Sequence, residues 1–382
     1  MIDRRSLLLA AAAHGALLLP GIGFARAETE RRLVVLLLRG ALDGLHAVVP
    51  YAEPAYTAAR RQLALGPGSD GGAVKLDGMF ALHASLAHTA VLYARGEALF
   101  VHAVASPYRG RSHFDGQNIL ESGAARPYAR RDGWIGRLLP LLPGGRAVAV
   151  TPALPLVLQG SPDVVSYVPS GDDDTSEDLL ERVGLLYADD ALLQGLWAEA
   201  LNIQRLAGDP GDGGRRLEQL STVAGRFLSK RQGPRIAVLE SHGWDTHTNQ
   251  VVRLVRKFGK LDAALAALET ALGASWADSL VLIVTEFGRT VETNGTGGTD
   301  HGTASVVLMA GGAVRGGRVI ADWPGLSRPA LFEGRDLRPT TDLHTLLAGV
   351  ISDHFALDPA LVAQSLFPGS RIGRAWPGLL RG

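Results

Sequence analysis

The sequence predicts an α/β fold: a doubly wound, mostly parallel sheet with helices on both faces. Continuous apolar runs recur along the chain, and segments with helical periodicity separate them. An uninterrupted apolar run is typical of a parallel strand that is buried on both faces. We therefore expect strands at 33–38, 97–105, 235–240, 279–288 and 303–312.

Length and composition limit the kinds of chemistry. The chain has 382 residues, of which 46% are hydrophobic, so it can bury one large core. Its 38 Lys and Arg residues balance 38 Asp and Glu residues, so we expect no nucleic-acid partner, and nothing in the sequence identifies a protein partner. The absence of cysteine excludes thiolate nucleophiles, disulfides and Cys-ligated zinc. Histidine, carboxylate and hydroxyl groups must supply any chemistry.

Residues 1–27 are predicted to be an export signal. An arginine pair, Arg4 and Arg5, precedes an apolar run, and Ala25-Arg26-Ala27 fits a small-residue cleavage site. The run is shorter than the roughly 18–20 residues that span a bilayer, so a permanent N-terminal anchor is the weaker alternative. The arginine pair resembles a twin-arginine signal. We expect a periplasmic or secreted protein with no stable membrane span after cleavage.

Residues 28–382 are predicted to form a single domain. The segment 251–273 has helical spacing and joins the expected strands at 235–240 and 279–288. Between about 140 and 232 the sequence is loop-rich and acidic and then helical, which indicates a helical insertion. An amphipathic helix is expected within 340–357.

Polar residues follow each apolar run, and ligands bind open α/β sheets at the carboxyl ends of the strands. Asp43 follows the first run, and Ser112 and His113 follow the second. Ser112 lies where a helix is expected to begin, so its hydroxyl either caps the helix or meets an anionic substrate there. Arg109 and Arg111 supply guanidinium groups suited to a phosphate or sulfate.

Two further segments carry metal-ligand residue types. "SHGWDTHTNQ" contains His242, Asp245 and His247 within six positions of a glycine-containing loop, and Asp300-His301 follows "TGGT". Imidazole and carboxylate groups bind zinc, manganese or iron, and they also act as general bases. The alternative for the first segment is a solvated polar loop.

Other ionisable residues have structural interpretations. Glu286 ends an apolar run, and a buried carboxylate needs a partner, so we expect a structural ion pair with Arg289. Five histidines are expected in the core or on the surface without a ligand role: His83, His88, His102, His344 and His354.

These motifs, with "LRGALDGLHAVVPY", "RSHFDGQNILESG" and "TEFGRTVETNGTGGTDHGTASVVLMAGG", resemble a bacterial family of exported proteins carrying a domain of unknown function. That family is in turn distantly similar to the alkaline phosphatase and sulfatase superfamily. The second resemblance implies an alkaline-phosphatase-like sheet, a centre of Asp and His metal ligands at the strand ends, and a nucleophile on the helix after an early strand.

Carried over by position, the resemblance implies a metal set and a catalytic set. The metal ligands would be Asp43, Asp245, His247, Asp300 and His301, with His344 the candidate for a late histidine of a second metal. Ser112 matches the nucleophile, His113 or His242 would transfer protons, and Arg111 would orient the anionic group.

The expected function is therefore an exported metal-dependent hydrolase of a phosphate or sulfate ester, with a small-molecule or polymeric anionic substrate. The divalent ion could be zinc, calcium, magnesium or manganese. Two alternatives stay open: a non-catalytic exported binding or assembly protein that keeps the fold, and an oxidoreductase that uses the same ligands for iron.

Overall fold

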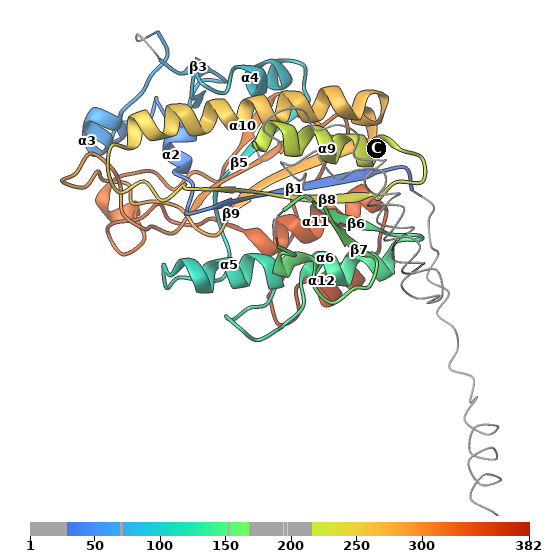
Figure 1. Cartoon of the computed structure of the whole chain (residues 1–382). Coiled ribbons are helices and arrows are strands. Elements are labelled where there is room, and N and C mark those ends of the chain that lie inside the picture. The colour runs from blue at the N-terminus through green and yellow to red at the C-terminus, as the bar shows by residue number, and fades with distance from the viewer. Residues whose placement is uncertain (1–28, 69–71, 152, 168–193, 195–196, 198–215) are drawn as a thin grey trace, which may run out of the picture.

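A computed structural model describes residues 29–68, 72–151, 153–167, 194, 197 and 216–382. The predicted export signal, residues 1–27, lies outside the described residues. A nine-stranded sheet crosses the middle of the described part (Figure 1), in the order β11-β5-β10-β9-β1-β8-β6-β7, with β12 also pairing with β5. Its strands are β1 (Arg32–Arg39), β5 (Ala98–Ala105), β6 (Ala147–Ala149), β7 (Val164–Ser166), β8 (Ile236–His242), β9 (Ser279–Thr285), β10 (Ser305–Ala310), β11 (Arg318–Ile320) and β12 (Thr341–Asp342).

The sheet is parallel except at β10. β1 pairs in parallel with β8 and β9, and β6 pairs in parallel with β8 and β7. β10 runs antiparallel to both of its neighbours, β9 and β5. The start of β10 therefore lies at the same edge as the carboxyl ends of β1, β8 and β9. The predicted mostly parallel α/β class is confirmed, and all five predicted apolar runs form strands of this sheet.

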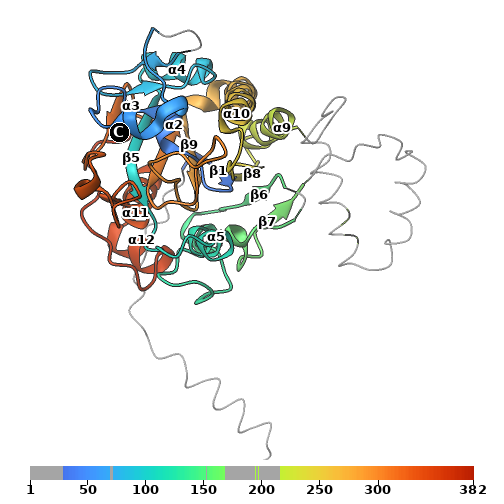
Figure 2. The same ribbon diagram turned by 90° about the vertical axis from the view of Figure 1, so that its left-hand side faces the viewer.

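Helices cover both faces of the sheet (Figures 1 and 2). On one face lie α4 (Ala87–Ala94), α9 (Leu217–Ser229) and α10 (Gln250–Leu272). On the other lie α5 (His113–Ser122), α6 (Trp134–Leu138), α11 (Leu343–Phe355) and α12 (Pro359–Leu366). Alternate side chains of β1 enter the two layers, with Leu33, Val35 and Leu37 in one and Val34, Leu36 and Leu38 in the other.

Shorter elements complete the fold. A three-stranded sheet contains β2 (Val48–Val49), β4 (Ala81–Leu82) and β3 (Val74–Lys75), beside the helices α2 (Gly44–Ala47) and α3 (Tyr56–Arg60). The 3-10 turns are η1 (Arg61–Leu63), η2 (Leu139–Leu141), η3 (Leu156–Leu158), η4 (Gly273–Asp278) and η5 (Arg328–Ala330). Among the described residues, no helix combines the length and the apolar character needed to cross a bilayer.

The segment from about 140 to 232, predicted to be a helical insertion, is described only in part, and α9 is a helix where one was expected. β6 and β7 extend the main sheet, and α9 packs against α10. The two helices approach closely because position 225 is glycine: a Cβ there would lie 2.5 Å from the Cβ of Ala271. Both flanks thus belong to the main fold. Apart from Gln194 and Trp197, the part between 168 and 215 lies outside the described residues, and the predicted domain boundaries stay a prediction.

Candidate functional site

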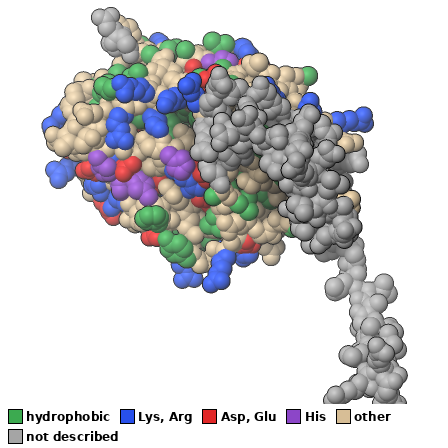
Figure 3. Space-filling view, in the orientation of Figure 1, with side chains coloured by type: hydrophobic (Ala, Val, Ile, Leu, Met, Phe, Trp, Pro, Cys, Tyr) green, Lys and Arg blue, Asp and Glu red, His purple; other side chains and the backbone are tan. Residues whose placement is uncertain are grey.

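The carboxyl edge of the parallel strands carries a cluster of histidine and acidic side chains. Three segments contribute to it: the loop after β8, the start of α5, and the connection from β9 to β10. Figure 2 looks along the molecule from the end that lies on the left in Figure 1. Figure 3 shows histidines beside acidic side chains toward this end, with Lys and Arg around them. The antiparallel direction of β10 brings the 286–304 connection back to this edge.

Three residues form the centre of the cluster. His113, Asp245 and His301 each offer a ligand atom within 4.8 Å of the other two. The Nε2 atoms of His113 and His301 are 3.0 Å apart, and the Asp245 carboxylate lies 3.3 Å from His301 Nε2 and 3.5 Å from His113 Nε2. His247 adjoins this centre, with its Nε2 2.9 Å from Asp245 Oδ1 and 3.1 Å from His301 Nε2.

All three histidines direct Nε2 toward the cluster and use Nδ1 elsewhere. Each Nδ1 lies 2.8–3.1 Å from an oxygen that can only accept a hydrogen bond, so each Nδ1 carries the proton. The acceptors are the Glu286 carboxylate for His113, the Asp300 carboxylate for His247 and the Arg111 carbonyl for His301. When a ring is neutral, its Nε2 therefore presents a lone pair to the cluster. Such outer hydrogen bonds orient histidine ligands in metal sites.

This donor set fits a divalent cation. Lone pairs that face one another across about 3 Å repel unless a proton or a cation lies between them. Tetrahedral zinc, with metal–ligand bonds of about 2.0–2.1 Å, places neighbouring ligand atoms about 3.3 Å apart. The three separations within the centre are 3.0, 3.3 and 3.5 Å. His113, Asp245 and His301 could thus hold one ion, and His247 is placed to add a fourth ligand atom.

Glu286 does not pair with Arg289, contrary to the expected ion pair. Its buried carboxylate accepts hydrogen bonds from the Gly40 amide at 2.8 Å, His113 Nδ1 at 2.8 Å and Gln117 Nε2 at 3.1 Å. Burial alone would raise the pKa of Glu286, but the hydrogen bonds, led by that from His113, outweigh burial and lower it. The carboxylate is thus ionised and holds the His113 ring in place.

Arg289 instead forms an ion pair with Asp245. Its Nη1 lies 2.5 Å from Asp245 Oδ1, and its Nε and Nη2 bind the side chain and the carbonyl of Thr299. Burial opposes ionisation of Asp245, but Arg289 and the neighbouring histidines lower its pKa overall. A buried guanidinium therefore keeps the Asp245 carboxylate charged and oriented toward the cluster.

The pKa values of two cluster histidines shift in opposite directions. The hydrogen bond to Glu286 raises the pKa of His113 above its usual value, although burial opposes this. Burial and the neighbouring His113 lower the pKa of His301. His301 is therefore neutral near pH 7, which is the form that binds a metal.

The structure does not bring Asp43 into the cluster. Asp43 is fully buried, and its carboxylate pairs with Arg60 and accepts a hydrogen bond from Gln250 Nε2 at 2.5 Å. Gln250 in turn accepts from the hydroxyls of Thr246 and Thr299. Because Arg60 already compensates its charge, Asp43 has the contacts of a structural residue and not those predicted for a metal ligand.

Four other predicted residues have contacts that differ from their expected roles. Asp300 serves as the acceptor for His247, and the Arg111 guanidinium is held by Asp336 at 2.7 Å and Glu333 at 2.5 Å. His242 has a side chain that is 67% exposed and that lies 3.3 Å from Glu240, outside the cluster. His113, expected to transfer protons, contributes a ligand atom to the centre.

Ser112 lies where the sequence predicts it, directly before α5. It is the N-cap residue of the helix, and its hydroxyl makes no capping hydrogen bond. Its backbone N–H donates to the Tyr108 hydroxyl at 3.1 Å.

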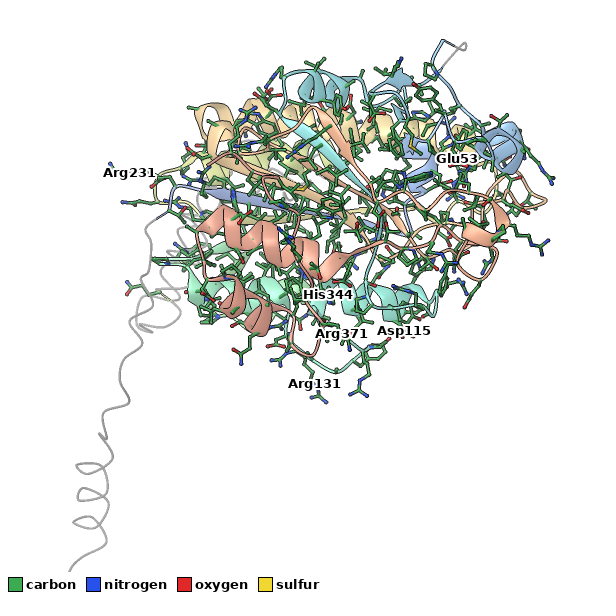
Figure 4. The ribbon with its side chains drawn as sticks, turned by 180° about the vertical axis from the view of Figure 1, so that it is seen from behind. Glu53, Asp115, Arg131, Arg231, His344 and Arg371 are labelled. Atoms are coloured by element: carbon green, nitrogen blue, oxygen red, sulfur yellow. The ribbon has the colours of Figure 1, made fainter. Side chains whose placement is uncertain are left out.

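The remaining histidines lie outside the cluster. His83, His102, His344 and His354 are buried, and burial lowers the pKa of each. His344 lies on α11 (Figure 4), and its Nδ1 is 2.7 Å from Ser370 Oγ, so it joins no second group of ligands. Among the described residues, no group of three ligand side chains lies away from this cluster.

Sequence reasoning missed the role of Glu286. The available signal was a carboxylate at the end of the buried run "LVLIVTE", which required a partner. The short spacing in sequence favoured Arg289, three residues away, as the partner of Glu286. The actual partner, His113, is 173 residues away in sequence.

One protein-family model matches part of the chain. A family model described as "Protein of unknown function (DUF1501)" matches residues 207–367. No curated protein matches the chain.

Solved structures with similarity to the chain include three hydrolases. Alkaline phosphatase from the Antarctic bacterium TAB5 is 12% identical, with a TM-score of 0.37, over 77% of this chain and 94% of that one. The phosphonate monoester hydrolase of Agrobacterium radiobacter is 12% identical, with a TM-score of 0.38, over 90% and 79% of the two chains. An inactive murine ectonucleotide pyrophosphatase/phosphodiesterase 5 in complex with AMP is 8% identical, with a TM-score of 0.38, over 86% and 96%.

Proposed function

We propose that this protein is an exported, metal-dependent hydrolase of phosphate or sulfate esters. The observation that carries the proposal is the convergence of two Nε2 atoms and one carboxylate at the carboxyl edge of the sheet, each held by an outer hydrogen bond. Imidazole nitrogens and a carboxylate held in this way are ligand types that divalent cations use, with outer hydrogen bonds that orient them.

His113, Asp245 and His301 would hold the ion, with His247 beside them. The ion, when bound, would polarise the ester and offset the negative charge that develops on its oxygens. Glu286, Arg289 and the Arg111 carbonyl keep the ligand side chains oriented before any substrate arrives. Such preorganisation avoids the cost of rearranging the site during the reaction.

Ser112 is the proposed nucleophile. Ser112 directly precedes His113 in sequence, and its hydroxyl makes no hydrogen bond that caps α5. The N-terminus of that helix favours an anionic group. Attack by the Ser112 oxygen on phosphorus or sulfur would release the alcohol and leave the acid esterified to the serine, and water would then release the acid.

One observation favours the non-catalytic alternative. Arg111, the residue expected to orient the anion, is already paired with Asp336 and Glu333. A protein that keeps the ion but turns over no ester would be a binding or assembly protein.

The test combines elemental analysis with turnover of aryl phosphates and aryl sulfates. Protein purified without chelator should contain about one equivalent of a divalent metal, which His301→Ala and His113→Ala should lose. Ser112→Ala should keep the metal and lose turnover. His88→Ala is the matched control, because His88 pairs with Glu269 outside the cluster. Absence of metal from the unsubstituted protein would contradict the proposal, and metal without turnover would favour the alternative.

A further inference from the structure

Neither histidine that the sequence suggested for proton transfer is free to serve Ser112. Nε2 of His113 belongs to the centre and its Nδ1 binds Glu286, while His242 lies outside the cluster. A serine hydroxyl is a weak nucleophile until a neighbouring base or a metal takes its proton. The groups that contact Ser112 itself are therefore the candidates for this role.

The backbone holds Ser112 against the cluster from both sides. Arg111, directly before Ser112, directs its carbonyl to Nδ1 of His301 at 3.0 Å. His113, directly after Ser112, directs its Nε2 to Nε2 of His301 at 3.0 Å. Ser112 therefore lies between two residues that contact the same candidate ligand, and its Cα is about 3.8 Å from the Cα of each.

The hydroxyl of Tyr108 contacts Ser112. It accepts from the Ser112 amide at 3.1 Å and donates to the Asp115 carboxylate at 3.0 Å. A phenol oxygen has two lone pairs, so one remains for the Ser112 hydroxyl. Burial raises the pKa of Tyr108, with a further rise from Asp115, and hydrogen bonds from the amide and the hydroxyl of Ser112 offset this only in part. Tyr108 is therefore a neutral phenol between Ser112 and Asp115.

The loop that precedes α5 is shaped around the Tyr108 ring. Position 110 is glycine, and a Cβ there would lie 2.5 Å from Tyr108 Oη and 2.7 Å from its Cζ. Arg111 has a φ of 59°, in the left-handed region that residues other than glycine rarely adopt. Such strained conformations persist where surrounding contacts enforce them, and they cluster at functional sites. The contact between Tyr108 and Ser112 is thus maintained at a cost in backbone strain.

Asp115, in the first turn of α5 (Figure 4), is the carboxylate at the other end of this contact. Among the described residues, Asp115 forms no ion pair. The other acidic side chains around Ser112 each pair with an arginine or a histidine; they are Asp245, Glu286, Glu333 and Asp336. A carboxylate that neutralises no cation is available to accept a proton.

We propose that Tyr108 and Asp115 form a proton relay for Ser112. The inference rests on the proposed function, because it takes Ser112 as the nucleophile. As the Ser112 oxygen bonds to phosphorus or sulfur and the ester oxygen leaves, the Ser112 proton passes to Tyr108 Oη and the Tyr108 proton passes to Asp115. The leaving alkoxide takes its proton from water. When water later releases the acid, the protons return to Tyr108 and Ser112 by the same path.

The experiment measures Ser112 by two independent reactions in metal-loaded protein. The first is turnover of p-nitrophenyl phosphate and p-nitrophenyl sulfate. The second is labelling by an alkyl fluorophosphonate, in which the Ser112 oxygen bonds to phosphorus and fluoride leaves, followed by mass spectrometry with Ser112→Ala as the unlabelled reference. The variants are Tyr108→Phe, Asp115→Asn and the double variant.

Tyr128→Phe is the matched control. A hydrogen bond to Asp115 raises the pKa of Tyr128 as well, but Tyr128 is an exposed residue that follows α5. This variant removes a phenol from Asp115 and leaves Tyr108 in place, so it should change neither reaction.

Asp115→Asn distinguishes a relay from a structural contact. Asparagine keeps an oxygen that accepts from Tyr108, but it cannot take up a proton at neutral pH. We expect it to lower kcat/KM and the labelling rate by about 100-fold or more, as for loss of a general base. Tyr108→Phe should cause a similar loss, and the double variant should be no worse, because the two residues act as a unit. Metal content and inhibition by inorganic phosphate should stay within about twofold of the unsubstituted protein.

The outcomes separate this inference from the proposed function. Asp115→Asn with normal turnover or labelling, or an equal loss in Tyr128→Phe, overturns the relay even if the esters are hydrolysed. Turnover that survives Ser112→Ala also overturns the relay and leaves the hydrolase standing. Labelling of Ser112 that depends on Tyr108 and Asp115, without ester turnover, supports the relay and contradicts the hydrolase. If Ser112 is not labelled and no ester is turned over, both proposals fail.

Discussion

Replacing Glu286 by glutamine tests whether the buried carboxylate governs metal binding. Oε1 of Glu286 accepts from the Gly40 amide, His113 Nδ1 and Gln117, and Oε2 accepts from the Thr285 hydroxyl at 2.9 Å. A glutamine can keep its oxygen at the first position. Its amide nitrogen then faces Thr285 Oγ1, which can accept. The substitution therefore preserves shape and removes mainly the negative charge.

The expected cost follows from the loss of that charge. A charged hydrogen bond contributes about 1.5–3 kcal/mol and a neutral one about 0.5–1.5 kcal/mol, so the bond to His113 should weaken by about 1–1.5 kcal/mol. A weaker bond leaves the ring less well oriented and its Nε2 less basic. Loss of an outer-shell partner typically lowers metal affinity about 10–100-fold. We expect Glu286→Gln to raise the zinc Kd by at least about ten-fold.

The assay is competition of zinc-free protein against a chelating dye, with thermal unfolding of the zinc-free protein measured alongside. Glu121→Gln is the matched control: Glu121 is also buried, but it pairs with Arg39 and the Val157 amide. It should lower the melting temperature without changing the zinc Kd. A zinc Kd for Glu286→Gln within about twofold of the unsubstituted protein, or an equal loss in the control, would refute the reasoning.

Three further predictions concern stability. Asp262→Ala should lower the free energy of unfolding by about 2–4 kcal/mol in urea titrations, because the buried carboxylate accepts three hydrogen bonds at 2.7–2.8 Å at the start of α4. Gly288→Ala should destabilise the protein by about 1–3 kcal/mol or more and weaken zinc binding, because the new Cβ would lie 1.9 Å from the Ala304 carbonyl oxygen. Burial lowers the pKa of His354 from 6.5 to about 3. On acidification the imidazole is therefore protonated near pH 6.5 in the unfolded chain but only near pH 3 in the folded protein. Stability is therefore full above pH 6.5 and falls toward pH 3, by roughly 2 kcal/mol for this histidine at pH 5.

Each of these predictions has a clear contrary result. For Asp262→Ala, unchanged urea midpoints would show that the cap contributes nothing. For Gly288→Ala, normal melting and zinc binding would mean that the 286–304 connection can move away from β10. For the histidine, His354→Leu should flatten the decline in unfolding free energy between pH 7 and pH 5, and a slope equal to that of the unsubstituted protein would contradict the low pKa.

The architecture of the sheet was largely predictable because its signal is local. Runs buried on both faces are apolar without interruption, so β1, β5, β8, β9 and β10 are visible in the sequence. The same holds for α10, whose apolar spacing spans Gln250–Leu272. The direction of β10 was not predictable, because an apolar run reads the same in a parallel and an antiparallel strand. β6 and β7 were missed because each has only three residues.

The residues of the candidate site were likewise predictable only in part. The rule that ligands gather at the carboxyl edge of a parallel sheet identified Asp245, His247 and His301 as residues that lie together. It also selected Asp43, which lies near the same edge but has its charge compensated by Arg60. Position along a strand indicates which end of the sheet a side chain occupies, and it does not determine which atoms the side chain contacts.

The sequence by itself thus determined the fold class and the edge of the sheet at which the candidate site lies. Buried strands and helices have local patterns of apolar residues, and the polar residues that follow each strand mark its carboxyl end. The tertiary structure alone decided that Glu286 binds His113 while Arg289 binds Asp245. It also decided that the Nε2 atoms of His113, His247 and His301 face one another. These contacts join segments tens to nearly two hundred residues apart, and a hydrogen bond depends on ångström-scale distances that no local pattern encodes.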